Sequence, residues 1–231
     1  IERIRHASKY DWNLVHSFRT KEDSGHEQPW LRFLEGENPS YPEFILRASY
    51  DQVCRRLDSI RQDNEDLMKV HIHHWQNLNP VLTESLIQLT LGAPQIMYNG
   101  GLLICRVRYF DLDRRRPGLP EDIAALVEKL EEKRTVIRLV NLNSVHSRNV
   151  VIQAGAFGEH SFGSVRYSTD VNRHSRHIGN CSQTDLEAGQ YISVVNDNIF
   201  HLHMPPKKEI ILDLETERYV NRPSYEFPWN R

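Results

Sequence analysis

The stretch TVIRLVNLNSVHSRNVVIQAG, residues 135–155, decides the fold. It contains two apolar, β-branched runs, TVIRLVNLN and NVVIQAG, which meet at a polar turn. Similar short runs continue toward the C-terminal end as HSFGSVRYS, QYISVVND, IFHLHMP and KEIILDLE. Several short strands separated by polar turns, with no helix between them, are typical of an antiparallel β-sandwich. The sequence therefore predicts such a sandwich over about residues 102–231.

The residues just before this stretch predict one more strand and one short helix. A turn signal at Asn99-Gly100-Gly101 is followed by an alternation in which apolar positions flank Arg106 and Arg108. After Pro120 the apolar spacing changes to that of one helix face. The residues on that face are Ile123, Leu126, Val127 and Leu130. We expect a short helix near residues 120–132.

The N-terminal part, residues 1–98, carries a helical pattern instead. Ser40 and Glu43 have capping-box spacing, and Pro42 suits a first helical turn. Apolar residues then recur at helical intervals, at Leu46, Tyr50, Val53, Leu57 and Ile60. This pattern predicts an amphipathic helix over roughly residues 42–62, whose opposite, charged face is expected to meet solvent.

A second helix is expected from Pro80 to Leu91, with Asn79 as its N-cap and Gly92 at its end. Its apolar residues cover most of its circumference, which favours burial between other elements. Because two helices cannot enclose it alone, we expect further helices around it, either from residues 1–39 or from an upstream part. The predicted fold class is α+β, an N-terminal helical segment followed by an antiparallel β-sandwich.

Composition limits the partner classes. The chain has 231 residues and a formal charge of −2, from 29 basic and 31 acidic residues. That balance disfavours nucleic acid and anionic membranes as partners. No apolar run approaches the roughly 18 residues that a membrane span needs. We expect a soluble globular protein, and nothing in the sequence indicates its compartment or oligomeric state.

The segment VHIHHWQNLNPVLTE, residues 70–84, gathers three histidines and a tryptophan ahead of the second helix. Histidine titrates near neutrality and suits proton transfer, which makes His73 and His74 candidate catalytic residues. Trp75 offers a flat face to a sugar ring, and Asn77 offers directional hydrogen bonds. A metal site is the less favoured interpretation, because the spacing matches no recognised ligand pattern. The alternative is that Trp75 only fills core space.

Two further groups of residues are weaker candidates. Tyr98 and Asn99, in PQIMYNGG, are placed to reach the same end of the helical part, Tyr98 as an acid or base and Asn99 as a substrate ligand. The alternative is a tight turn. His201 and His203, with Glu209 after them, have the alternation of a cupin-like metal site, although a half-exposed strand has the same pattern. We expect no cofactor and assign no metal ligand.

The order of parts resembles the C-terminal portion of carbohydrate-active enzymes built from an α/α toroid and a β-sandwich. The strand series TVIRLVNLN and NVVIQAGAFGEHSF and the ending RYVNRPSYEFPW carry this resemblance, which is one of layout and covers about the last two-thirds of the chain. It implies a fragment or subunit that associates with further helical polypeptide. Working residues in such toroids lie at helix ends around a cleft, where His73, His74, Asn77 and Tyr98 are expected. No family-specific catalytic motif is present.

The sequence leaves three functions open. The first is the C-terminal part of a hydrolase or lyase that acts on a carbohydrate or another polyhydroxylated substrate by histidine acid/base chemistry. The second is a non-catalytic β-sandwich module that binds a ligand or partner. The third is a cupin-like metalloenzyme. The substrate and the bond that is broken are not indicated by the sequence.

Overall fold

The computed structural model describes residues 27–93, 104–168, 182–187 and 190–230. The chain divides into two units, a helical unit, Ile1–Leu86, and a sandwich unit, Ile87–Arg231. Each is described by itself. Helices in the first part and two antiparallel sheets in the second confirm the predicted α+β class. Among the described helices, none has the length and apolar character needed to cross a membrane.

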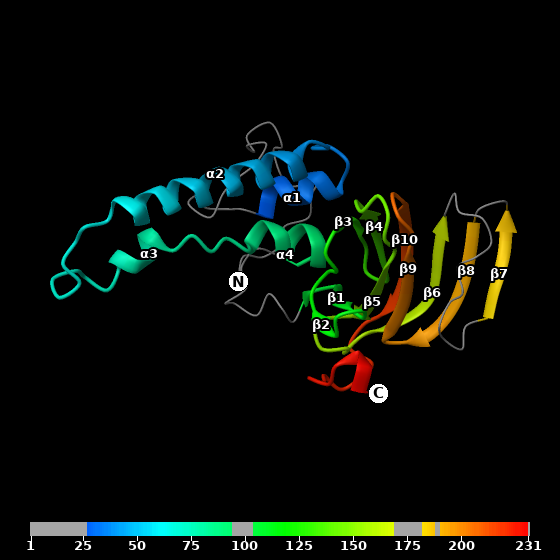
Figure 1. Cartoon of the computed structure of the whole chain (residues 1–231). Coiled ribbons are helices and arrows are strands. Elements are labelled where there is room, and N and C mark those ends of the chain that lie inside the picture. The colour runs from blue at the N-terminus through cyan, green and yellow to red at the C-terminus, as the bar shows by residue number, and fades with distance from the viewer. Residues whose placement is uncertain (1–26, 94–103, 169–181, 188–189, 231) are drawn as a thin grey trace. The chain divides into compact units, whose positions relative to one another are not determined.

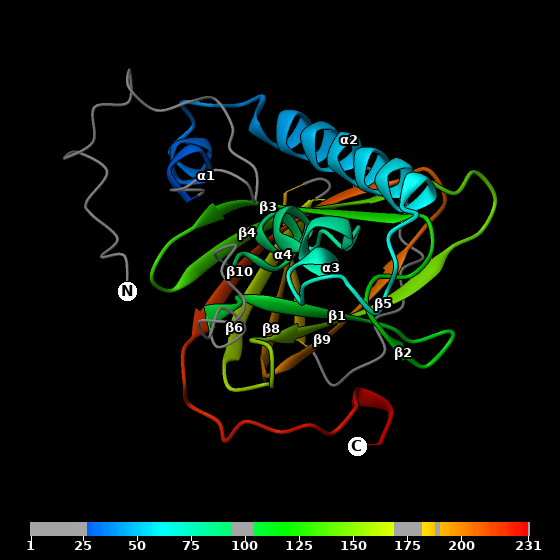
Figure 2. The same ribbon diagram turned by 90° about the vertical axis from the view of Figure 1, so that its left-hand side faces the viewer.

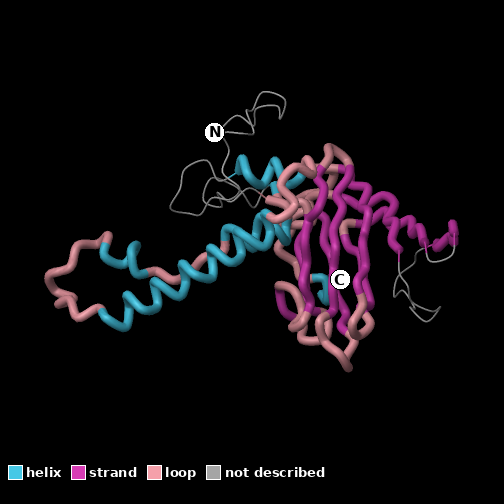
Figure 3. Tube along the Cα trace, turned by 90° about the horizontal axis from the view of Figure 1, so that it is seen from above, coloured by secondary structure: helices cyan, strands magenta, loops and turns pink. Residues whose placement is uncertain are grey.

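The helical unit is built from α1 (Glu27–Leu34), α2 (Tyr41–Gln62) and α3 (His74–Leu78). A further helix, α4 (Glu84–Leu91), spans the division between the two units. After α2 the chain turns back, so that α3 lies beside the C-terminal end of α2 (Figures 1 and 3). Within the unit, Arg56 of α2 donates a hydrogen bond to the backbone oxygen of Asn79, and the hydroxyls of Ser49 and Ser85 lie 2.9 Å apart.

Helix α2 confirms the predicted helix at residues 42–62, but its apolar stripe is not its buried face. The buried side chains of α2 are Tyr41, Ile45 and Gln52. The ring of Tyr41 packs at 6.1 Å from that of Phe33 in α1. Ser40 precedes the helix but makes no side-chain capping hydrogen bond. Packing therefore uses a face that contains a glutamine, which an apolar-periodicity argument does not select.

The prediction that a helix begins at Pro80 is wrong. Asn79 instead ends α3, because its backbone N–H donates to the carbonyl of Trp75. Its side-chain oxygen accepts from Val81, which forms an Asx turn. α4 begins only at Glu84, and Leu86 within it is 50% exposed while Leu89 is buried. The expectation that the segment after Pro80 is buried along its whole length is therefore also wrong.

The sandwich unit consists of two antiparallel sheets (Figure 1). The four-stranded sheet has the order β2-β1-β5-β9, and the six-stranded sheet has the order β3-β4-β10-β6-β8-β7. Their bounds are β1 Val107–Asp111, β2 Arg116–Pro117, β3 Ile123–Leu130, β4 Arg134–Asn141, β5 Arg148–Ala154, β6 Ser161–Ser168, β7 Ser182–Glu187, β8 Gln190–Asp197, β9 Ile199–Met204 and β10 Glu209–Glu217.

Period-2 alternation builds the sandwich core. In β4 every second residue is buried, and the same holds along β9 and β10. The central strand β5 is buried at five consecutive positions, Val150 to Ala154. Ile152, Phe162, Leu202 and Leu212 meet in the resulting cluster. The stretch that predicted the sandwich therefore supplies one strand to each sheet.

The predicted short helix near residues 120–132 is wrong, because these residues form strand β3. Ile123 and Val127 are buried, and Val127 lies opposite Ile137 of β4. Residues four apart share a face in a helix and also in a strand, so this spacing does not separate the two. A register shift between Val127 and Lys129 further disturbs the alternation.

After β10 the chain runs along the edge of the sandwich to a short 3-10 helix, η4 (Pro228–Asn230), drawn in red in Figure 2. The backbone N–H of Tyr219 donates to His160, and Ser224 donates to the carbonyl of Phe157. Phe227 and Trp229 stack with ring centroids 4.8 Å apart. This C-terminal segment is thereby tied to the loop between β5 and β6.

Candidate functional site

The histidine segment lies in and before the five-residue helix α3, which begins at His74 and has His73 as its N-cap residue. The Nε2 atom of His74 lies 2.7 Å from the carboxylate of Asp63, and both side chains are about four-fifths buried. This hydrogen bond is the main cause that lowers the pKa of Asp63 below its ordinary value. A carboxylate that fixes one ring nitrogen of a histidine is the arrangement that orients a general base.

The neighbours of His74 are less organised. His73 is exposed and its Nδ1 atom lies 2.9 Å from the side-chain oxygen of Gln76, while its ring stacks on that of His71 at 4.7 Å. Trp75 is exposed and meets His74 edge to face at 5.6 Å. The helix α3 includes Asn77, but its side chain is not among those described. Tyr98 and Asn99 lie outside the described residues.

The structure also places the second histidine pair. His203 in β9 contacts the side-chain oxygen of Asn149 at 2.9 Å. His201 is partly buried, its Nδ1 atom has no hydrogen-bond partner among the described residues, and burial lowers its pKa. Within the described ranges no three His, Cys, Asp or Glu side chains come together as a metal site would require.

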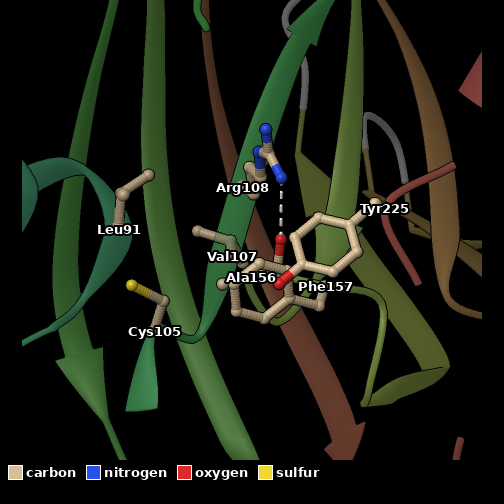
Figure 4. Close-up of a pocket in the computed structure, with 7 residues that line it drawn as sticks. All are labelled: Leu91, Cys105, Val107, Arg108, Ala156, Phe157 and Tyr225. Carbon is tan, nitrogen blue, oxygen red and sulfur yellow. Dashed lines mark hydrogen bonds between the residues drawn. The ribbon is translucent and has the colours of Figure 1, made fainter. Parts of the chain in front are cut away.

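A pocket of about 280 Å³ opens in the sandwich unit, near the ends of β1 and β5 (Figure 4). Residues from four separate stretches of the chain line it: Leu91, Cys105, Val107, Arg108, Ala156, Phe157 and Tyr225. Its interior is mainly apolar, and the Arg108 guanidinium and the Tyr225 ring stand at its side. Ligand pockets typically combine an apolar lining with a few placed polar groups, so this is the candidate site.

Two contacts with described residues hold Arg108 in place. One terminal nitrogen donates to the carbonyl of Ala156 at 3.0 Å, the dashed line of Figure 4, and the guanidinium lies 4.8 Å from the centre of the Phe110 ring. A guanidinium carries five N–H donors, so this bond leaves further donors for a ligand. Burial lowers the pKa of Arg108, yet an arginine side chain remains charged at neutral pH.

The loop that follows β5 forms one wall of the pocket around a buried carboxylate. Glu159 accepts hydrogen bonds from the backbone N–H groups of Ala156, at 3.3 Å, and Phe157, at 2.7 Å. Gly155, with a φ of +83°, allows the tight turn, and a Cβ there would lie 2.6 Å from either carboxylate oxygen. The loop conformation therefore depends on Gly155 and Glu159 together.

Cys105 lines the pocket and is fully buried. Burial, with a smaller contribution from the nearby Glu159 carboxylate, raises the pKa of its thiol to about 12. The thiolate is the nucleophilic form of cysteine, so this thiol acts as an apolar wall at neutral pH. The chemistry that the pocket offers is binding: an exposed aromatic ring, a guanidinium and apolar walls.

Sequence reasoning missed this pocket. Arg108 appeared only as the polar phase of a strand, and Tyr225 belonged to an ending noted for its layout. The one local signal was GAFGEH, residues 155–160, in which two glycines flank a short turn that ends in an acidic residue. Both glycines have positive φ, which marks a loop of defined shape.

Comparison with known proteins adds one match. Residues 1–87 match a protein family described as a domain of unknown function, DUF8034. The matched range coincides closely with the helical unit, Ile1–Leu86. The comparison with curated proteins and that with solved structures gave no match.

Proposed function

We propose that the sandwich unit is a binding module for carbohydrate, and that its pocket takes one sugar ring. The observation that carries the proposal is Tyr225, which is 85% exposed at the rim of an open pocket. Its ring meets Phe157 edge to face at 5.3 Å, so the contact holds an otherwise exposed side chain. An aromatic ring held beside a pocket offers one flat face to the apolar face of a sugar.

Arg108 supplies the polar half of this site. Its donors suit ring hydroxyls, and they suit a sugar carboxylate still better because charge-assisted pairs with arginine are stronger. The pocket volume of about 280 Å³ falls at the small end of ligand sites, which fits one ring rather than a chain of rings. We expect affinity of about millimolar for a single ring, since small open sites bury little ligand surface.

Ligand-observed NMR of the whole chain with a methyl hexoside and a methyl hexuronide tests the proposal. Tyr225→Ala should weaken binding of both sugars at least about tenfold, and Arg108→Gln should weaken the hexuronide more than the hexoside. Tyr50→Ala is the matched control, because Tyr50 is an exposed tyrosine of the helical unit. Wild-type binding by Tyr225→Ala, or no saturation transfer to either sugar, would reject the module.

A second candidate is catalysis by the same chain as part of a larger carbohydrate-active hydrolase or lyase. The 2.7 Å contact between His74 and Asp63 supports it and favours His74 over His73 as the proton-transfer group. Trp75 is exposed next to it and is suited to stack on a sugar. In a complete, active assembly His74→Ala should lower kcat by about two orders of magnitude, whereas His73→Ala should change it little. Equal kcat values for the wild type and His74→Ala would remove this role.

A further inference from the structure

The apolar stripe of α2 forms a continuous exposed seam. We define the seam as Leu46, Tyr50, Val53, Leu57 and Ile60. The exposed fractions are 40% for Leu46, 69% for Tyr50, 37% for Leu57 and 41% for Ile60, while Val53 is half-buried. Isolated apolar residues on a surface need no explanation, but a contiguous row along one helix indicates an interaction surface.

The spacing of the seam specifies the shape of what covers it. Its residues are separated by four, three, four and three positions, which is the a/d repeat of a coiled coil. The 22 residues of α2 give a helix of about 33 Å, so the seam extends over two heptads. Knobs-into-holes packing on such a seam requires another α-helix lying nearly parallel to α2.

The helical unit itself packs on a different face of α2. Tyr41, Ile45 and Gln52 are the buried residues, and they lie roughly a third of a turn around the helix from the seam. Ser49 and Arg56, on that same side, contact Ser85 and the backbone of Asn79. The other flank of the seam carries Arg47 and Arg61, which are exposed and, among the described residues, pair with Glu43 and Asp58 of α2 itself.

The flanking charges select among possible helices. In a parallel pair of two α2 helices, Arg56 of one copy would face Arg61 of the other, and in an antiparallel pair Arg47 would face Arg61. Like charges at these positions oppose pairing of the chain with itself. Exposed ion pairs such as Arg47 with Glu43 contribute little and exchange readily, so both arginines can pair with carboxylates of a partner.

We propose that α2 docks an amphipathic helix of another polypeptide, with apolar residues on its seam and acidic residues beside them. This inference is independent of sugar binding in the sandwich unit, since it involves only residues of α2.

The probe is a synthetic, fluorescein-labelled helix with Leu and Ile at the seam positions and Glu at the flanking positions, compared with the same peptide carrying Lys instead. Fluorescence anisotropy with the whole chain should show binding of the Glu peptide and at least about tenfold weaker binding of the Lys peptide. Tyr50→Glu and Leu57→Glu should each weaken binding of the Glu peptide by about 30-fold or more. Arg55→Glu is the control, because Arg55 is exposed on the side of α2 opposite the seam; this variant should bind like the wild type.

Reversing both flanking charges, Arg47→Glu with Arg61→Glu, should invert the preference toward the Lys peptide, a result that a merely sticky surface does not give. Far-UV circular dichroism confirms that each variant remains helical, and Tyr50→Glu serves if Leu57→Glu does not fold. Two outcomes would overturn the proposal: the chain binds neither peptide or both equally, or it sediments as a dimer that Tyr50→Glu converts to a monomer.

Discussion

Replacing Gly155 with Ala tests the loop that forms the wall of the pocket. The residue has a φ of +83°, and an added Cβ would lie 2.5 Å from the Glu159 Cδ atom and 2.6 Å from both carboxylate oxygens. Such a Cβ cannot be accommodated, so the carboxylate must leave the position in which it accepts from the N–H groups of Ala156 and Phe157. Glu159 is buried, which leaves it no open volume into which to move without rearranging the loop.

The cost has two parts. The left-handed backbone conformation costs an L-residue about 1–2 kcal/mol. The loss of charge-assisted hydrogen bonds and the burial of an unpaired donor add about 1–3 kcal/mol. Gly118→Ala separates the two parts, because Gly118 has a φ of +99° in the same unit but nothing within 4 Å of its Cβ position. Gly155→Ala should therefore lower the free energy of unfolding by at least about 1 kcal/mol more than Gly118→Ala.

Guanidinium chloride unfolding followed by far-UV circular dichroism measures this difference, since the sandwich unit contains all the described strands. Equal losses for the two variants would show that Glu159 is not held by the loop as described. A larger loss for Gly155→Ala together with wild-type sugar binding would show instead that the loop matters for stability but not for the pocket.

Three further predictions concern titrating groups. Burial lowers the pKa of His201 from its ordinary value of 6.5, so the unfolded chain binds more protons below that pH and the sandwich unit should lose stability as the pH falls from 7 to 5. His201→Leu should reduce the pH slope of the unfolding free energy, by at most about 1.4 kcal/mol per pH unit. The control His146→Gln, at an exposed histidine, should not reduce it. Equal slopes for the wild type and His201→Leu would contradict the burial of His201. His74 is the main cause that lowers the pKa of the Asp63 carboxylate, so this pair stabilises the helical unit fully above the ordinary pKa of 3.8, and the stabilisation is lost as the pH falls through the lower pKa of the folded chain. Asp63→Asn should therefore flatten the acid part of the pH dependence of helical-unit unfolding. An unchanged pH dependence would show that the pair is not formed. Burial raises the pKa of Cys105 from 9.0 to about 12, so iodoacetamide at pH 8 should alkylate this thiol at least about 100-fold more slowly in the folded chain than in urea. Peptide mass spectrometry measures both rates, and comparable rates would mean an accessible thiolate.

Much of the fold followed from local pattern. The alternation in residues 135–155 predicted two strands, and these are β4 and β5. The local pattern gave the wrong element at β3, because Ile123 and Val127 share a face in either a helix or a strand. For α2 the pattern predicted the helix, but packing on the Gln52 face is a tertiary choice that no periodicity reveals. The start of α4 was predicted wrongly because an asparagine side chain suits an Asx turn as well as it suits an N-cap, and Asn79 forms the Asx turn.

The candidate site was harder to predict than the fold. His74 was named from composition, but its partner Asp63 is eleven residues away, across a turn whose path the sequence does not specify. Arg108, the Gly155–His160 loop and Tyr225 come from three distant stretches, and only the sandwich brings them together. Alternation indicates which strand face is buried, but it does not indicate where a loop and a C-terminal segment meet the strand end.

A crystal structure of the chain grown with the methyl hexuronide tests sugar binding in the pocket most directly. We expect sugar density in the pocket lined by Cys105, Arg108 and Ala156, with one ring face on Tyr225 and the carboxylate within hydrogen-bond distance of the Arg108 guanidinium. A ring bound elsewhere, or an empty pocket in crystals whose sugar concentration exceeds the measured Kd, would contradict it.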